Sequence, residues 1–213
     1  MFQPHPSRRL NELFARKPYQ GAEPSTARFL FVGLDANYSP DLEDSPVFES
    51  VLEYHEDGIA FWRRTGVHHP FLLPQYRGDG RRYHRTFARI GFGPQHAELV
   101  SFIELLHVPT VGRNKLLPHD LDANHLKLVS EAIFCGRAEH IFVSSGVLRL
   151  MQASKAFPCL GAAQAPSGPL RVLHTSSDRT VYMHLHFSNY GKFEQQLVAE
   201  AKAIGSLLPE GDA

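Results

Sequence analysis

The sequence predicts an α/β protein in which helices cover both faces of a central, largely parallel sheet of four to five strands. Short apolar runs, which are typical of buried strands, alternate along the chain with segments whose apolar residues recur at helical spacing. Such alternation is typical of a three-layer α/β/α sandwich. The 213 residues are enough for one domain of this kind, which we expect to span residues 1–213.

The composition is that of an ordinary globular protein, with 43% hydrophobic and 21% charged residues. No apolar run approaches the ~18 residues of a membrane span, and the first residues lack the pattern of a signal peptide. The two cysteines, Cys135 and Cys159, do not form a Cys-x-x-Cys pair, so we expect neither a disulfide framework nor a thiolate zinc site. These features predict a cytoplasmic protein with no membrane partner.

The first part of the chain is expected to hold one helix, one buried strand and a second helix. Residues 1–27 are polar and read as an N-terminal extension with a short helix at 7–16, which Ser7 would cap. The continuous apolar run at 28–34, bounded by a glycine, predicts a fully buried strand. After a loop rich in proline and serine, residues 47–53 are expected to be helical.

The middle of the chain combines a long connection with two regular elements. An apolar patch at 59–62 leads into an irregular segment at 68–80, and so long a connection in a compact domain is usually functional. Residues 82–90 form an amphipathic pattern that predicts a helix, and the apolar run at 98–106 predicts a second buried strand. A turn is expected at 109–114, where proline and glycine occur together.

The rest of the chain continues the alternation. Residues 122–135 have the spacing of an amphipathic helix with Asp122 as its cap. The run at 140–144 predicts a third strand, followed by a short helix that begins at Gly146, and the Ala-, Pro- and Gly-rich residues 155–169 predict a loop. The last predicted elements are strands at 170–173 and 180–186 and a helix at 193–208.

Two segments at opposite ends of the chain carry most of the candidate chemistry. Gly33-Leu34-Asp35-Ala36-Asn37-Tyr38 follows the first buried strand, and His186-Phe187-Ser188-Asn189 follows the last. Ligands of open parallel sheets bind at the carboxyl ends of the strands, so we expect Asp35 and His186 to face each other across one pocket. An aspartate opposite a histidine supports acid/base or hydrolytic chemistry. The first segment is not a Gly-rich phosphate loop, and no cofactor is expected.

Further candidate site residues are polar residues that lie within apolar stretches or next to a glycine. Glu104 lies in an apolar stretch, where a charge has to be paired, exposed or functional, and we expect it in the pocket. Ser144 and Ser145 precede a glycine without the elbow of a serine hydrolase, so we expect a helix N-terminus there. His184 and His186 share a face, but a metal would need a third ligand from His68 or His69, and we expect no metal site.

Acidic and basic residues balance at 22 each, which argues against a protein that coats nucleic acid non-specifically. Arginines nevertheless cluster locally. These arginines are candidates for phosphate contacts, or else form a solvated face: Arg63, Arg64, Arg77, Arg81, Arg82, Arg85 and Arg89.

The two segments resemble motifs of the uracil-DNA glycosylase superfamily. Gly33-Leu34-Asp35-Ala36 is similar to the Gly-x-Asp/Asn-Pro motif after the first strand of that family, and His186-Phe187-Ser188 is similar to its His-Pro-Ser motif. The resemblance spans roughly residues 28–205. It implies a DNA glycosylase-like hydrolase of base excision repair, which flips a damaged or deaminated base out of DNA and cleaves its N-glycosidic bond with water.

The resemblance also implies roles for individual residues. Asp35 would position the water and stabilise the cationic sugar, and His186 would stabilise the departing base. Glu104 stands near an asparagine of the uracil-specific members; an ionised glutamate accepts hydrogen bonds but donates none, so a base with an exocyclic amine suits it better than uracil. Other implied substrate contacts are the pocket residues Gly33, Leu34, Asn37 and Tyr38, a stacking aromatic (Phe48 or Phe61), a phosphate contact at Ser188, and Asn189 in a loop that enters DNA.

Two other functions remain open at the level of sequence. A non-catalytic member of the same fold would bind a nucleotide or nucleic acid in the same pocket. An unrelated α/β hydrolase or transferase of a small polar metabolite would use Ser144 and Ser145 or the histidines instead. A single cleft that holds Asp35 and His186 and is bordered by arginines favours the first two functions over the third.

Overall fold

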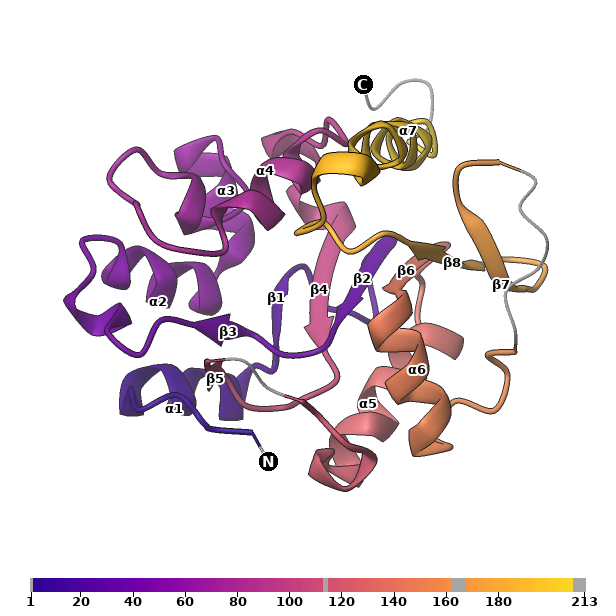
Figure 1. Cartoon of the computed structure of the whole chain (residues 1–213), viewed down its shortest axis with the longest axis horizontal. Helices are drawn as coiled ribbons and strands as arrows, with labels where there is room; N and C mark the ends of the chain where they lie inside the picture. The colour runs from indigo at the N-terminus through magenta and orange to yellow at the C-terminus, as the bar shows by residue number, and fades with distance from the viewer. Residues whose placement is uncertain (1, 113–114, 162–167, 209–213) are drawn as a thin grey trace.

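The computed structural model describes residues 2–112, 115–161 and 168–208, and within them the chain forms an α/β structure around a mixed six-stranded sheet (Figure 1). The four central strands run parallel, and the strand at each edge runs antiparallel to its neighbour. Across the sheet the strands are β1 (Tyr19–Gly21), β4 (Val100–Glu104), β2 (Phe29–Gly33), β6 (His140–Ser144), β8 (Thr180–His184) and β7 (Arg171–Thr175).

The predicted α/β class is confirmed, whereas the predicted sheet was too small and too uniform in direction. The extra strand is β1, which lies in the segment expected to be an extension and pairs with β4. It was missed because three residues with a single buried side chain, Gln20, have no strand pattern of their own. The pairing of Gln20 with Phe102 in β4 makes this segment a strand.

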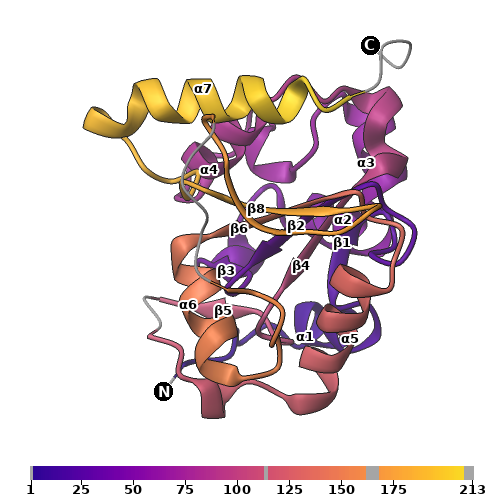
Figure 2. The same cartoon turned by 90° about the vertical axis from the view of Figure 1, so that its right-hand side faces the viewer.

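Helices cover both faces of the sheet (Figure 2). One core lies between the sheet and α5 (Ala123–Phe134) and α6 (Ser145–Ser154), and the opposite core lies under α3 (Gly58–Thr65), α4 (Arg81–Ala88) and α7 (Glu194–Gly205). A third cluster packs α1 (Arg8–Arg16) on α2 (Phe48–Glu56) beside the β1 edge (Figure 1). No helix in the described ranges has the length and apolarity needed to cross a membrane.

Local sequence signals explain the starts of two predicted helices. Ser7 Oγ accepts the Leu10 N–H at the start of α1, and Asp122 accepts the His125 N–H at the start of α5, as the capping patterns predicted. Ser144 is the N-cap residue of α6, so the expected helix N-terminus is confirmed.

The observed bounds differ from the prediction in several places. The second buried strand, β4, starts at Val100 because the 3-10 helix η3 (Pro94–Leu99) precedes it. The last predicted strand, β8, ends at His184. The apolar patch at 59–62 belongs to α3. The predicted turn contains β5 (Thr110–Val111), which pairs with β3 (Asn37–Tyr38), and its residues 113–114 lie outside the described residues, as do 162–167 of the predicted loop.

Residues that share the α3/α4/α7 face of the sheet form two rows that cross the central strands. The first row is aromatic: Phe31 stacks on Phe102 at 5.5 Å and on Phe142 at 4.7 Å, and Phe142 stacks on Tyr182 at 5.4 Å. The second row lies two residues further along each strand, at the carboxyl ends, and by register consists of Glu104, Gly33, Ser144 and His184. The sheet therefore offers a polar edge directly beyond an aromatic floor.

Candidate functional site

A cavity of about 740 Å³ opens at the carboxyl ends of the central strands, where ligands of parallel sheets bind. Its size is within the usual range of small-molecule sites. Asp35 and His186, predicted to share one pocket, both line it. The other predicted site residues on its wall are Gly33, Leu34, Asn37, Tyr38, Glu104 and Ser188.

Asp35 is held by a short polar relay from the neighbouring loop. Thr110 Oγ1 donates to Asp35 Oδ2 at 2.5 Å, and Asn37 Nδ2 donates to Thr110 Oγ1 at 3.0 Å. The amide of Asn37 also donates to the Gly112 carbonyl at 2.6 Å. The pairing of β3 with β5 sets Asn37 opposite Thr110 and so fixes the relay. Asn37 thus lines the cavity and also orients the carboxylate through Thr110, a residue that the sequence analysis did not identify.

Glu104 extends over Gly33 from the adjacent strand. A Cβ atom at Gly33 would lie 1.9 Å from Glu104 Oε2, so only glycine leaves room for this carboxyl group. Burial raises the pKa of Glu104 to about 8, and the charge of Asp35 adds to the shift. At neutral pH the group is therefore mainly a carboxylic acid that donates one hydrogen bond and accepts others. The expected preference for an amino base applies to an ionised Glu104, and a sequence does not show how far a carboxyl group is desolvated.

His186 presents a defined tautomer at the rim of the cavity. Its Nδ1 accepts the Ser188 backbone N–H at 3.3 Å, so the neutral ring carries its proton on Nε2. The ring lies 5.4 Å from that of Tyr83 and reaches solvent. The surrounding protein still desolvates it enough to lower its pKa, and the Asp35 charge opposes this shift. His186 is thus suited to donate a hydrogen bond as a neutral group.

His184 has a different environment from His186. Its Nδ1–H donates to the Leu185 carbonyl at 2.6 Å, the ring packs on Phe187 at 4.6 Å, and burial lowers its pKa to about 4. The two histidines therefore do not act as a pair. In the part of the chain that the structure describes, no group of three or more His, Cys, Asp or Glu side chains is arranged to hold a metal ion.

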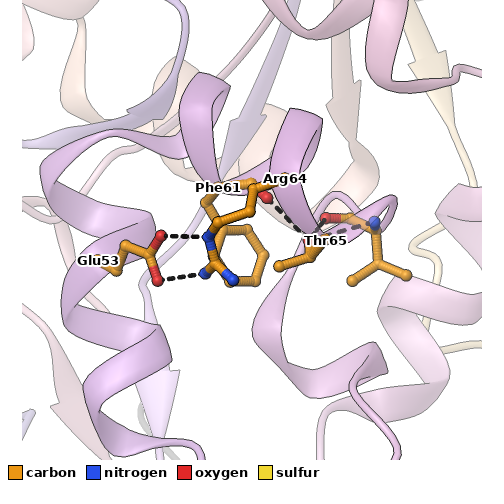
Figure 3. Close-up of polar contacts among 5 residues, drawn as sticks. Glu53, Phe61, Arg64 and Thr65 are labelled. Atoms are coloured by element: carbon orange, nitrogen blue, oxygen red, sulfur yellow. Dashed lines mark hydrogen bonds and ion pairs between the residues drawn. The ribbon is translucent and has the colours of Figure 1, made fainter.

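Asn189 and both stacking candidates, Phe61 and Phe48, are the predicted site residues that the structure does not place on the cavity wall. Phe61 is fully buried in α3, where its ring packs on Tyr54. In Figure 3 the Phe61 ring lies beneath the guanidinium group of Arg64. Arg64 forms an ion pair with Glu53, in which Nη2 of the arginine lies 2.5 Å from Oε2 of the glutamate. This packing holds Phe61 away from any base in the cavity. Phe48, the other stacking candidate, is buried in the α1/α2 cluster under Arg9.

Other aromatic rings line the cavity in place of Phe61. Phe71 and Tyr76 stack on each other at 4.0 Å, and the rings of His69 and His84 stack at 3.5 Å. All four lie on the cavity wall together with Tyr83. Three of the four belong to the long irregular segment at 68–80, which was predicted to be functional from its length alone.

The arginine cluster includes members that form ion pairs with glutamates and members that lie on or near the cavity wall. Arg63, Arg64 and Arg89 form ion pairs with glutamates. Arg77 lines the cavity. Arg82 lies 4.9 Å above the ring of Tyr190, whose side chain is 67% exposed in the loop after β8. Arg82 and Tyr190 are close in the chain to Tyr83 and Ser188, which lie on the cavity wall.

Comparison with known proteins assigns no family to this chain. No protein-family model matches it, and a search of curated proteins gave no match. The functional interpretation rests on the residues of the cavity and on the resemblance of the two motifs.

Proposed function

We propose that this protein is a DNA glycosylase-like hydrolase that cleaves the N-glycosidic bond of a flipped base. One observation carries the proposal. Asp35 and His186, which are far apart in the sequence, line the same cavity at the carboxyl ends of parallel strands, and His186 titrates under the influence of the Asp35 charge. A carboxylate opposite a hydrogen-bond donor is the arrangement that glycosidic cleavage requires, because the sugar becomes positive while the base becomes negative.

In the proposed reaction the bond between C1′ and the base nitrogen breaks, and its electron pair leaves with the base. Asp35, held by Thr110, stabilises the positive sugar and orients the water whose oxygen bonds to C1′. The neutral His186 donates from Nε2 to the departing base and so offsets its negative charge. The water loses one proton as its oxygen bonds to C1′, and the base anion takes up one proton, so atoms and charge balance.

The surroundings of the cavity favour a nucleic acid over a small metabolite. Arg77 lies on the cavity wall, and Arg82 lies beside the exposed ring of Tyr190, close in the chain to the wall residues Tyr83 and Ser188. Phosphates are bound by such cations, and bases stack on such rings. Ser144, the nucleophile of the alternative hydrolase, also lies on the cavity wall, but its sequence lacks the nucleophile elbow.

A base-release assay tests the proposal. Single- and double-stranded oligonucleotides with uracil, hypoxanthine, xanthine or hydroxymethyluracil are incubated with the protein, and abasic product is measured. Asp35→Asn and His186→Ala should each lose the product, whereas Asp44→Asn and His119→Ala, matched changes at exposed positions outside the cavity, should retain it.

The same variants separate catalysis from binding. If the wild type releases no base but binds a modified oligonucleotide tightly, the protein is a binding member of the same fold. If it neither releases nor binds, the glycosylase proposal is wrong.

A further inference from the structure

Gln20 is a buried polar residue that the proposed reaction does not use. It lies on β1, is 4% exposed, and lines the cavity. Its carboxamide nitrogen is buried and has no hydrogen-bond partner among the residues that the structure describes. Leaving such a donor unsatisfied costs about 1–3 kcal/mol, so buried amides without partners are uncommon and call for an explanation. A ligand in the cavity would supply the missing acceptor.

Gln20 and Glu104 lie on the same face of the sheet. Gln20 pairs with Phe102, and Glu104 is two residues further along β4, so their side chains point to the same side. Glu104 extends over Gly33 toward the centre of the sheet. The two residues therefore offer a carboxamide and a carboxyl group to one ligand, from two adjacent strands.

The groups that face Glu104 keep its carboxyl group in the acid form at neutral pH. Asp35 is the charged neighbour, and its negative charge acts in the same direction as burial. The phenols of Tyr38, Tyr54 and Tyr83 interact with the Glu104 charge, and desolvation raises the pKa of each, so all three stay neutral. The imidazoles on the same cavity wall, His69 and His84, are also neutral, because burial lowers the pKa of each.

We propose that Glu104 and Gln20 together read the edge of the flipped base, and that the proton on Glu104 decides which edge fits. With its proton, Glu104 accepts from a ring N–H and donates to the neighbouring carbonyl, while Gln20 donates to a second acceptor. A keto base matches this pattern. Without its proton, Glu104 offers only acceptors, so it repels the carbonyl and favours an amino base. This inference rests on the proposed function, since it assumes that a base enters the cavity.

The test uses binding instead of cleavage. Two single-stranded oligonucleotides of the same sequence carry one 2′-fluoro-deoxyuridine or one 2′-fluoro-deoxycytidine, which resist cleavage because fluorine disfavours positive charge at C1′. Their dissociation constants are measured by fluorescence anisotropy at pH 6.5 and 8.8. For the wild type we expect the keto base to bind at least about tenfold tighter at pH 6.5, as expected for a mismatched buried hydrogen bond. At pH 8.8 this preference should disappear or reverse.

Two variants make the test specific. Glu104→Gln keeps an acceptor beside a donor but cannot titrate, so it should keep the keto preference at both pH values. Any change in affinity that comes from titration of the base itself should also appear in this variant, so the comparison with the wild type isolates the effect of Glu104. Gln20→Leu should weaken binding of the keto base several-fold at both pH values. Thermal unfolding of each variant establishes that it is folded.

Two results would overturn the inference: a keto preference of the wild type that does not change with pH, or its loss in Glu104→Gln at pH 6.5. Base release is measured separately. A keto preference without release would refute the proposed reaction and leave the reading of the base intact. Base release without a keto preference would refute the reading of the base and leave the proposed reaction intact.

Discussion

Replacement of Gly33 by alanine tests the geometry of the cavity most directly. The new Cβ would lie 1.9 Å from Glu104 Oε2 and 2.5 Å from its carboxyl carbon, whereas real contacts of this kind stay above 3.0 Å. The carboxyl group therefore has to retreat by at least about 1 Å. The backbone of Gly33 has no positive φ, so alanine introduces no backbone strain and the effect comes from this contact alone.

The expected cost of the substitution in the wild type is about 1–3 kcal/mol of unfolding free energy, as for other overpacked sites. For about 2 kcal/mol in a chain of this size, the melting temperature should fall by roughly 4–8 °C. Base release should fall by about 100-fold, because a displacement near 1 Å of a group that positions a substrate costs on this order.

In a Glu104→Ala protein, Gly33→Ala should increase the free energy of unfolding instead of lowering it. With the carboxyl group removed, the alanine at position 33 has room, and Gly→Ala then stabilises by about 0.4–1 kcal/mol through the unfolded chain. The double-mutant cycle should therefore show a coupling of about 2–3 kcal/mol between positions 33 and 104. Equal destabilisation by Gly33→Ala in both backgrounds, measured by urea unfolding, would show that Glu104 does not lie over Gly33.

Three further outcomes follow from other parts of the structure. Thr110→Val keeps the shape of a fully buried side chain but removes the donor to Asp35, so base release should fall by about tenfold while Thr110→Ser retains most of it. The free energy of unfolding should decline as pH falls below 6.5, because burial lowers the pKa of His68 to about 3, so that only the unfolded chain binds a proton at this residue. Urea unfolding at pH 7, 6 and 5 should show a shallower decline for His68→Leu. Arg82→Ala should weaken binding of oligonucleotides of any sequence and reduce the slope of log Kd against log salt by about 1, whereas Arg8→Ala, at an exposed position on α1, should change neither.

The central strands could be predicted because their apolar runs are buried on both faces, and residues 140–144 form β6 as expected. The short strands could not. β1 and β5 have too few residues for a pattern, and their partners, β4 and β3, lie far away in the sequence. Their bounds are a property of the assembled sheet.

The same division holds for the candidate site. Asp35, Glu104 and His186 could be brought together in advance, because the carboxyl ends of parallel strands meet at one edge. Gln20 and Thr110 could not, since Gln20 reaches the cavity, and Thr110 reaches Asp35, through short strands that the sequence concealed. The stacking role of Phe61 had no support from its helical context, since the interior of α3 places that ring in the core.

The protonation states of the cavity explain how two neighbouring carboxyl groups can serve one reaction. If both Asp35 and Glu104 were ionised, a base that gains negative charge would face an anion where it is to be bound. Burial and the charge of Asp35 hold the proton on Glu104, while desolvation keeps His184 neutral and disfavours a charge on His186. The negative charge is thus left on Asp35, where the proposed reaction develops a positive sugar, and neutral donors face the base. Two carboxyl groups in unequal environments can in this way take opposite roles, one as an anion and one as an acid.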